Sequence, residues 1–123
     1  MPSTTLSKIR ALIPELLAVA QSEYDTWQQD ANGINPELGC GGICQDIAEA
    51  MAGVVAQNGI DVEIVDNDGV GEQHVWGEAP DADHRIIIDI PAAHYERGGG
   101  YVWRKKPNVR FRAEHLIIEP IRI

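Results

Sequence analysis

The stretch of residues 60–90 limits the possible folds of this chain more than any other part. It holds three strand-like segments, residues 60–65, 72–79 and 84–90, separated by turn sequences at residues 66–69 and 80–83. Connections this short join neighbouring antiparallel strands, because a parallel pair needs a long crossover. Residues 86–88 are three consecutive isoleucines, apolar on both faces, which indicates a central strand.

Two other stretches are helical in pattern. Between residues 6 and 29, apolar side chains recur at spacings of three and four, and Pro14 should divide this run into a short helix and a longer one. Residues 43–58 have the same periodicity, and Gly59 follows as a plausible helix stop. These segments should form N-terminal helices and a further helix that pack on the sheet.

The remaining sequence is less regular. Residues 91–107 look irregular, with the glycines at 98–100 as a loop or a lid, and residues 116–121 read as a final strand. Pro120 should place that strand at an edge of the sheet. We therefore expect residues 1–123 to form one α+β domain with an antiparallel sheet of four or more strands.

The helix predicted over residues 43–58 carries a cysteine in its first turn. A glycine-bearing loop, residues 30–42, leads directly into Cys44. A helix N-terminus has partial positive charge and free N–H groups, which lower a thiol pKa and can stabilise an oxyanion. Helical spacing turns Cys44 toward the apolar side of the helix. Asp46 and Glu49 would partly oppose a thiolate there, so another positive group is needed.

His74 can supply that group. In a hairpin symmetric about residues 80–83, counting back from the turn pairs His74 with Asp89 on one face of the sheet, which we expect to be the side facing Cys44. Asp89 would accept a ring N–H, fix the tautomer and favour the imidazolium, and His74 would take the thiol proton of Cys44. Alone, Cys44 reads as a buried structural thiol; with His74 and Asp89 it indicates a catalytic triad.

Four short motifs occur in this sequence in an order and at a spacing that are typical of a known enzyme superfamily. They are Cys44 at a helix start, Gly59-Ile60, the strand His74-Val75-Trp76-Gly77-Glu78, and Asp89-Ile90-Pro91. Over roughly residues 40–91 the chain thereby resembles the transglutaminase-like superfamily of papain-like thiol enzymes. The resemblance implies a papain-like fold, a Cys44–His74–Asp89 triad, and a hydrolase or acyltransferase acting on a peptide or other amide substrate without a cofactor. The superfamily contains peptidases, amidases, acyltransferases and cross-linking enzymes, and also members that have lost activity.

Further residues belong to this hypothesis. The backbone N–H of Cys44 would be one oxyanion donor, and Asn35 in the preceding loop is a candidate for the second. Trp76 is a candidate substrate contact, although a core role is the commoner one for such a residue. Glu78 is expected to be structural or solvent-facing. Cys40 is either a loop thiol or a redox partner of Cys44.

Two alternatives of other classes stay open: a structural zinc site formed by Cys40, Cys44 and His74, and an inactive binding module. The net charge of −9 argues against nucleic acid or an anionic membrane as a partner. No apolar run approaches the roughly 20 residues of a membrane span. The first five residues show no secretory pattern, and two cysteines in a chain of this size are no disulfide framework, so we expect a protein of the reducing cytoplasm.

Overall fold

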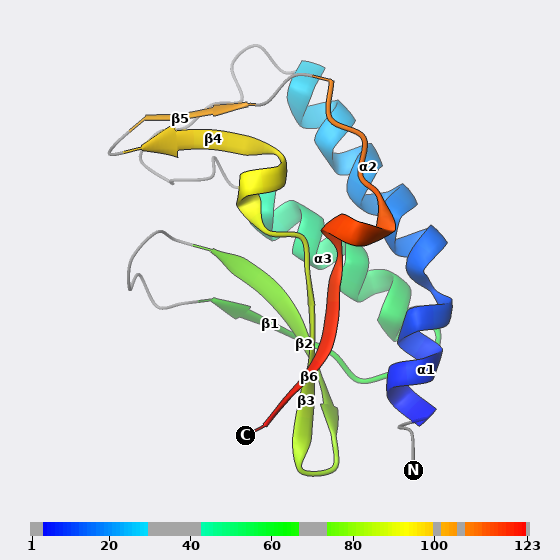
Figure 1. The fold of residues 1–123 in the computed structure, drawn as a ribbon. Helices are drawn as coiled ribbons and strands as arrows, with labels where there is room; N and C mark the ends of the chain where they lie inside the picture. The colour runs from blue at the N-terminus through cyan, green and yellow to red at the C-terminus, as the bar shows by residue number, and fades with distance from the viewer. Residues whose placement is uncertain (1–3, 30–42, 67–73, 100–101, 106–107, 123) are drawn as a thin grey trace.

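The computed structural model describes residues 4–29, 43–66, 74–99, 102–105 and 108–122 of the chain. Its elements in chain order are α1 (Thr4–Ala11), α2 (Ile13–Gln29), α3 (Ile43–Gln57), β1 (Glu63–Asp66), β2 (Val75–Asp81), β3 (His84–Asp89), the 3-10 helix η2 (Ala92–His94), β4 (Glu96–Gly99), β5 (Val102–Lys105), the 3-10 helix η3 (Ala113–His115) and β6 (Ile117–Arg122). They form a small α+β domain in which the helices lie on one side of the main sheet (Figure 1).

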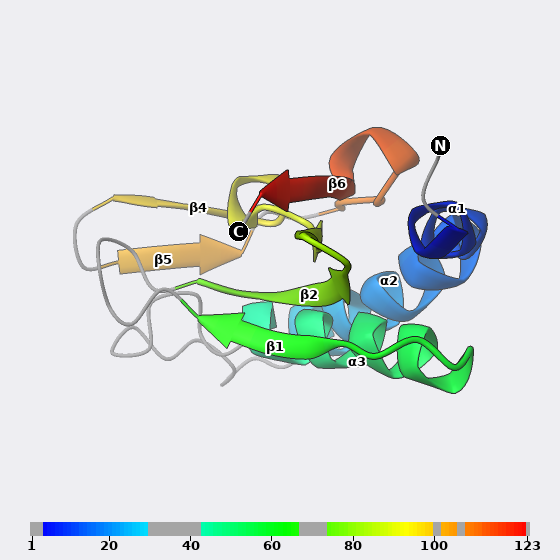
Figure 2. The same ribbon diagram turned by 90° about the horizontal axis from the view of Figure 1, so that it is seen from below.

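The main sheet has four antiparallel strands in the order β1-β2-β3-β6. β3 lies between β2 and β6, which confirms the predicted central strand. Among the described strands β6 is at an edge, as Pro120 predicted. Figure 2 shows α3 running along β1 and β2 on one face of the sheet. None of the helices in the described residues is both long and apolar enough to cross a membrane.

The helix boundaries follow from local sequence signals. α1 ends at Ala11 and α2 begins at Ile13, so the predicted break is confirmed, and Pro14 lies where α2 needs no backbone N–H donor. Gly59 adopts φ 78°, and the N–H of Ile60 donates to the carbonyl of Val55 at 3.3 Å. This left-handed glycine ends α3 at the predicted position.

The hydrophobic core lies between the helices and the sheet. Its largest fully buried side chains are Ile9, Leu16, Tyr24, Ile43, Ile47, Met51, Val55, Ile86, Ile88, Ile90 and Tyr95. Burying side chains of this size contributes about 1.5–3 kcal/mol each relative to leaving them exposed. The core therefore joins α1, α2 and α3 to the central strand and to the segment that follows it.

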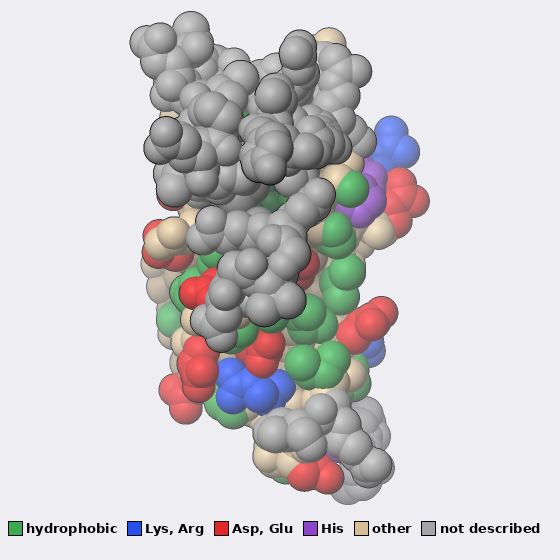
Figure 3. Space-filling model, turned by 90° about the vertical axis from the view of Figure 1, so that its left-hand side faces the viewer, with side chains coloured by type: hydrophobic (Ala, Val, Ile, Leu, Met, Phe, Trp, Pro, Cys, Tyr) green, Lys and Arg blue, Asp and Glu red, His purple; other side chains and the backbone are tan. Residues whose placement is uncertain are grey.

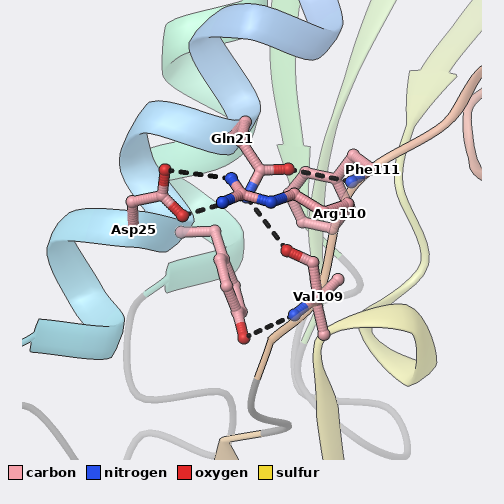
Figure 4. A network of polar contacts seen from close by, with 6 residues as sticks. Gln21, Asp25, Val109, Arg110 and Phe111 are labelled. Atoms are coloured by element: carbon pink, nitrogen blue, oxygen red, sulfur yellow. Dashed lines mark hydrogen bonds and ion pairs between the residues drawn. The ribbon is translucent and has the colours of Figure 1, made fainter.

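A polar network holds the segment before β6 against α2 (Figure 4). The Gln21 amide donates to the carbonyl of Val109 at 3.0 Å and to Asp25 at 2.9 Å, and it accepts from the N–H of Phe111 at 2.8 Å. The N–H of Val109 also donates to the hydroxyl of Tyr24 at 3.2 Å. Gln21 thus pairs with backbone groups of residues 109 and 111 much as a neighbouring strand would.

The prediction that residues 91–107 are irregular is wrong. η2 occupies residues 92–94, and β4 and β5 form a second, two-stranded antiparallel sheet. Gly98 and Gly99 belong to β4 rather than to a loop or lid. Glycine is rare in strands, and apolar and polar residues do not alternate regularly in this stretch, so the sequence pattern did not indicate strands here.

The register of the β2–β3 hairpin also differs from the prediction. Asp81 pairs with His84, so the turn is Ala82-Asp83 rather than residues 80–83. Ala82 has φ 54°, the positive φ that the tight hairpin turns require. The pairing partners are therefore shifted by two residues. Because this shift is even, the side chains that were predicted to share a face of the sheet still share one.

Candidate active site

His74 and Asp89 are in direct contact. The Nε2 atom of His74 lies 2.9 Å from each of the two carboxylate oxygens of Asp89. Continuing the observed register puts Asp89 opposite Trp76, so His74 reaches Asp89 diagonally, a span that long and aromatic side chains can bridge. The predicted contact is confirmed, and the predicted direct pairing that led to it is wrong.

This contact sets the tautomer of the imidazole. A carboxylate accepts hydrogen bonds, so Nε2 carries the proton and the basic lone pair of the neutral ring is on Nδ1. Nδ1 is buried, and the side chains of His74 and Asp89 are 22% and 12% exposed. The arrangement provides an oriented base with its ionic partner, both largely shielded from water.

A second set of polar contacts adjoins the pair. The rings of His74 and Trp76 stack with centroids 5.9 Å apart and an interplanar angle of 22°. The indole N–H of Trp76 donates to Glu78 at 2.7 Å, and Nε of Arg85 donates to the other oxygen of Glu78 at 2.6 Å. Arg85 also forms an ion pair with Glu63 at 3.0 Å. The hydrogen bond to Glu78 is the main cause that raises the pKa of Arg85.

Glu78 is buried, with 8% of its surface exposed, so the solvent-facing alternative is wrong. It nevertheless lies on the sheet face away from the helices, because it alternates with the core residue Ala79. Figure 3 views the molecule from the side away from α1 and α2, where acidic side chains flank a basic one among hydrophobic side chains. Trp76 and Arg85 lie against the Glu78 carboxylate, because each donates a hydrogen bond to one of its oxygens.

Cys44 is the second residue of α3 and is 3% exposed, so it points inward as predicted. It is disulfide-bonded in this structure, and no cysteine among the described residues is a free thiol. The sequence contains one other cysteine, Cys40, which lies outside the described residues. Cys44 is therefore in an oxidised state, in which it is neither a nucleophile nor a thiolate ligand.

The surroundings of Cys44 include the acidic first turn of α3. Asp46 lies at the surface, yet partial desolvation of its carboxyl, and then the charge of Glu49, raise its pKa above the ordinary value of 3.8. The repulsion between the two carboxylates is the smaller of these two causes, and the same kind of repulsion would act on a thiolate at Cys44. A Cys44 thiolate needs a compensating cation.

The elements that carry the three predicted triad residues meet at one end of the sheet. In Figures 1 and 2 the beginning of α3 lies at the same end as the beginning of β2 and the end of β3. Val75 and Ile88 face the helix layer, so alternation puts the His74–Asp89 pair on the other face of the sheet, at that end, and the prediction that this pair lies on the Cys44-facing side is wrong. Cys44 could approach His74 only around the end of the sheet, where His74 directly precedes β2. The close approach of Cys44 to His74 stays a prediction.

Other predicted site residues fall outside the described part of the chain. Asn35, the candidate second oxyanion donor, is one of them, as is Cys40 of the proposed zinc site. Within the described residues there is no cluster of three or more histidine, cysteine, aspartate or glutamate side chains that could hold a metal ion.

No family model matches this sequence, and no curated protein or solved structure is significantly similar to it. What the structure defines is a class of domain: three helices and a four-strand antiparallel sheet among the described residues, with a histidine–aspartate pair at one end of that sheet.

Proposed function

We propose that this protein is a papain-like thiol enzyme of the transglutaminase-like type that attacks amide bonds. Cys44 is the nucleophile, His74 the base and then the acid, and Asp89 the orienting carboxylate. The observation that carries the proposal is the contact of His74 Nε2 with both oxygens of Asp89. Burying a carboxylate is costly unless its partners compensate for the lost hydration. An imidazole oriented by such a group is the base that thiol enzymes use.

The reaction follows from the tautomer. Nδ1 of His74 takes the proton of the Cys44 thiol, and Sγ attacks the carbonyl carbon of the substrate. The backbone N–H of Cys44, in the first turn of α3, stabilises the oxyanion. The C–N bond breaks as His74 returns the proton to the leaving amine, which leaves a thioester on Cys44. Water then releases an acid, or a second amine takes the acyl group.

The disulfide of Cys44 adds a condition to this scheme. Attack requires the thiol, whereas the sulfur of Cys44 is oxidised in the structure. Two electrons from a thiol reductant, which is itself oxidised to a disulfide, release the Cys44 thiol. The proposal therefore predicts activity in the reduced protein and none in the oxidised one.

Site-resolved alkylation tests the nucleophile. The protein is reduced, freed of reductant, and treated with iodoacetamide between about pH 5 and 9, with mass spectrometry reporting Cys44 and Cys40 separately. At about pH 6, Cys44 should react faster, because an ion pair with His74 keeps it ionised well below the usual thiol pKa of about 8.5. His74→Ala should remove this advantage while Cys40 serves as the internal control. Equal rates at the two cysteines, rising only near pH 8–9, would refute the triad.

Turnover separates the enzyme from its alternatives. Reduced protein is mixed with p-nitrophenyl acetate, and an acetyl group on Cys44 is sought by mass spectrometry, with Cys44→Ala as the control. Faster loss of the adduct on adding a primary amine indicates acyl transfer, and loss in water alone indicates hydrolysis. A correctly folded, reduced protein with an unreactive Cys44 would favour the binding module. Stoichiometric zinc in the purified reduced protein would favour the metal site.

A further inference from the structure

Glu78 is the most unusual side chain outside the proposed triad. It is a carboxylate with 8% of its surface exposed, on a face of the sheet that no described helix covers. Each of its oxygens accepts a short hydrogen bond: Oε2 from the indole of Trp76 at 2.7 Å and Oε1 from Arg85 at 2.6 Å. Both oxygens of this group are thus committed to fixed partners.

Those contacts lead directly to the histidine. Trp76 stands between Glu78 and His74 on one face of β2, and its indole stacks on the imidazole with centroids 5.9 Å apart. An indole bonded through Nε1 cannot turn about its own side-chain torsions without losing that bond. The ring of His74 is therefore confined at its Nε2 edge by Asp89 and on one of its faces by an indole that Glu78 anchors.

We propose that Glu78 is a positioning residue for His74, acting through Trp76. This inference rests on the proposed function and adds to it a residue that touches neither the substrate nor the reacting atoms. Glu78 holds the indole, the indole holds the imidazole plane, and the imidazole then presents Nδ1 in one direction. Arg85 neutralises Glu78, so that the carboxylate can be buried beside the site.

A purely stabilising role explains this arrangement less well. Replacing a buried ion pair by well-packed apolar residues is commonly neutral or stabilising, so such a pair is weak evidence of stability in itself. The ion pair of Arg85 with Glu63 is the natural comparison. It uses the same guanidinium, but the side chain of Glu63 is 63% exposed, whereas Glu78 is buried.

The test is a double-mutant cycle on the reduced protein, read out as the rate of Cys44 alkylation at about pH 6. Glu78→Gln replaces one of the two acceptor oxygens by an NH2 donor, so one of the two fixed donors loses its acceptor. The cationic Arg85 should retain the remaining oxygen, because charge-assisted hydrogen bonds are the stronger ones, which leaves the indole N–H without this partner. This substitution should slow the reaction about tenfold, since small misplacements of a reacting group have effects of this order or larger. Trp76→Phe, which keeps a ring but removes the N–H, should slow it by a similar factor. Glu63→Gln is the matched control and should leave the rate unchanged.

The double-mutant cycle tests whether Glu78 affects the alkylation rate only through its hydrogen bond to the Trp76 indole. If Glu78 acts through the indole N–H, Glu78→Gln has no further effect in the Trp76→Phe background. If Glu78→Gln slows alkylation by the same factor in the wild-type protein and in Trp76→Phe, the proposal is refuted. A Glu78→Gln protein that melts at a lower temperature with its alkylation rate unchanged would refute it as well. If Glu78→Gln does not fold, the same prediction is carried by Trp76→Phe alone.

A spectroscopic readout keeps this inference separate from the proposed function. In NMR spectra, the indole N–H of Trp76 should exchange slowly with solvent in the wild-type protein and faster in Glu78→Gln, and the ring-current shift on the His74 protons should shrink. If Glu78→Gln changes the indole exchange and the His74 shifts in this way while Cys44 is unreactive in the wild-type protein, Glu78 positions His74 but the proposed enzyme function is wrong. Unchanged indole exchange and unchanged His74 shifts would refute the positioning role, whatever Cys44 does.

Discussion

Gln21 offers the sharpest quantitative test of how this fold is held together. Its amide is an acceptor for the N–H of Phe111 and a donor to the carbonyl of Val109, as Figure 4 shows. Gln21→Ala leaves both backbone groups without this partner. A buried group that loses its partner costs about 1–3 kcal/mol, and the lower end applies here because the two hydrogen bonds are only partly buried.

The magnitude can be built up from these terms. Two backbone groups at about 1 kcal/mol each give about 2 kcal/mol. The lost bond to Asp25, worth about 0.2–0.5 kcal/mol, is roughly offset by the better helix propensity of alanine. The free energy of unfolding should therefore fall by about 2 kcal/mol. For a chain of this length, that corresponds to a Tm lower by about 8 °C.

Gln45 provides a matched control. Its amide donates to Glu49 at 3.0 Å, the same one-turn spacing as Gln21 to Asp25, but this bond is exposed. Gln45→Ala should change the free energy of unfolding by less than about 0.5 kcal/mol. Urea unfolding of both variants, under non-reducing conditions, measures the difference. If the two variants lose the same stability within about 0.5 kcal/mol, the contact between α2 and residues 109–111 does not support the fold as argued.

Three further substitutions have defined outcomes. Asp89→Asn keeps the size of the side chain but removes the charge that faces His74, so the imidazolium is less favoured. The pH dependence of Cys44 alkylation should therefore shift to higher pH with little change in Tm. A lower Tm with an unchanged pH dependence of alkylation would mean that Asp89 only caps the strand. Ala82→Gly relieves a positive φ and should raise the free energy of unfolding by about 0.5–1 kcal/mol in urea titrations, whereas no gain would argue against that turn geometry. The pKa of Asp46 is raised in the folded state, so its ionised form costs stability above that pKa and the cost disappears as the pH falls below about 4. Asp46→Asn should accordingly raise Tm at about pH 7 but not at about pH 3, and equal shifts at both would contradict the electrostatic cause.

Local signals in the sequence were sufficient for most elements. Periodicity at three and four residues, interrupted by Pro14, predicted two helices where α1 and α2 are found. The isoleucine run at 86–88 predicted the central strand, and Pro120 the edge strand, because a buried strand needs apolar residues on both faces and proline cannot donate to a neighbour. The hairpin of β4 and β5 escaped prediction, since Gly98 and Gly99 are paired there by their backbone alone.

The sequence by itself determined which side chains share a face. Side chains alternate along a strand, so His74, Trp76 and Asp89 stayed together although the hairpin register was wrong by two residues. Tertiary structure decided what alternation cannot express: the turn at Ala82 that sets the register, the burial of Glu78 beneath Trp76 and Arg85, and the oxidised state of Cys44. The register and the burial of Glu78 depend on how β2 and β3 come to lie side by side, and the oxidation state of Cys44 depends on which sulfur it meets. The alternation of side chains along a single strand encodes none of these.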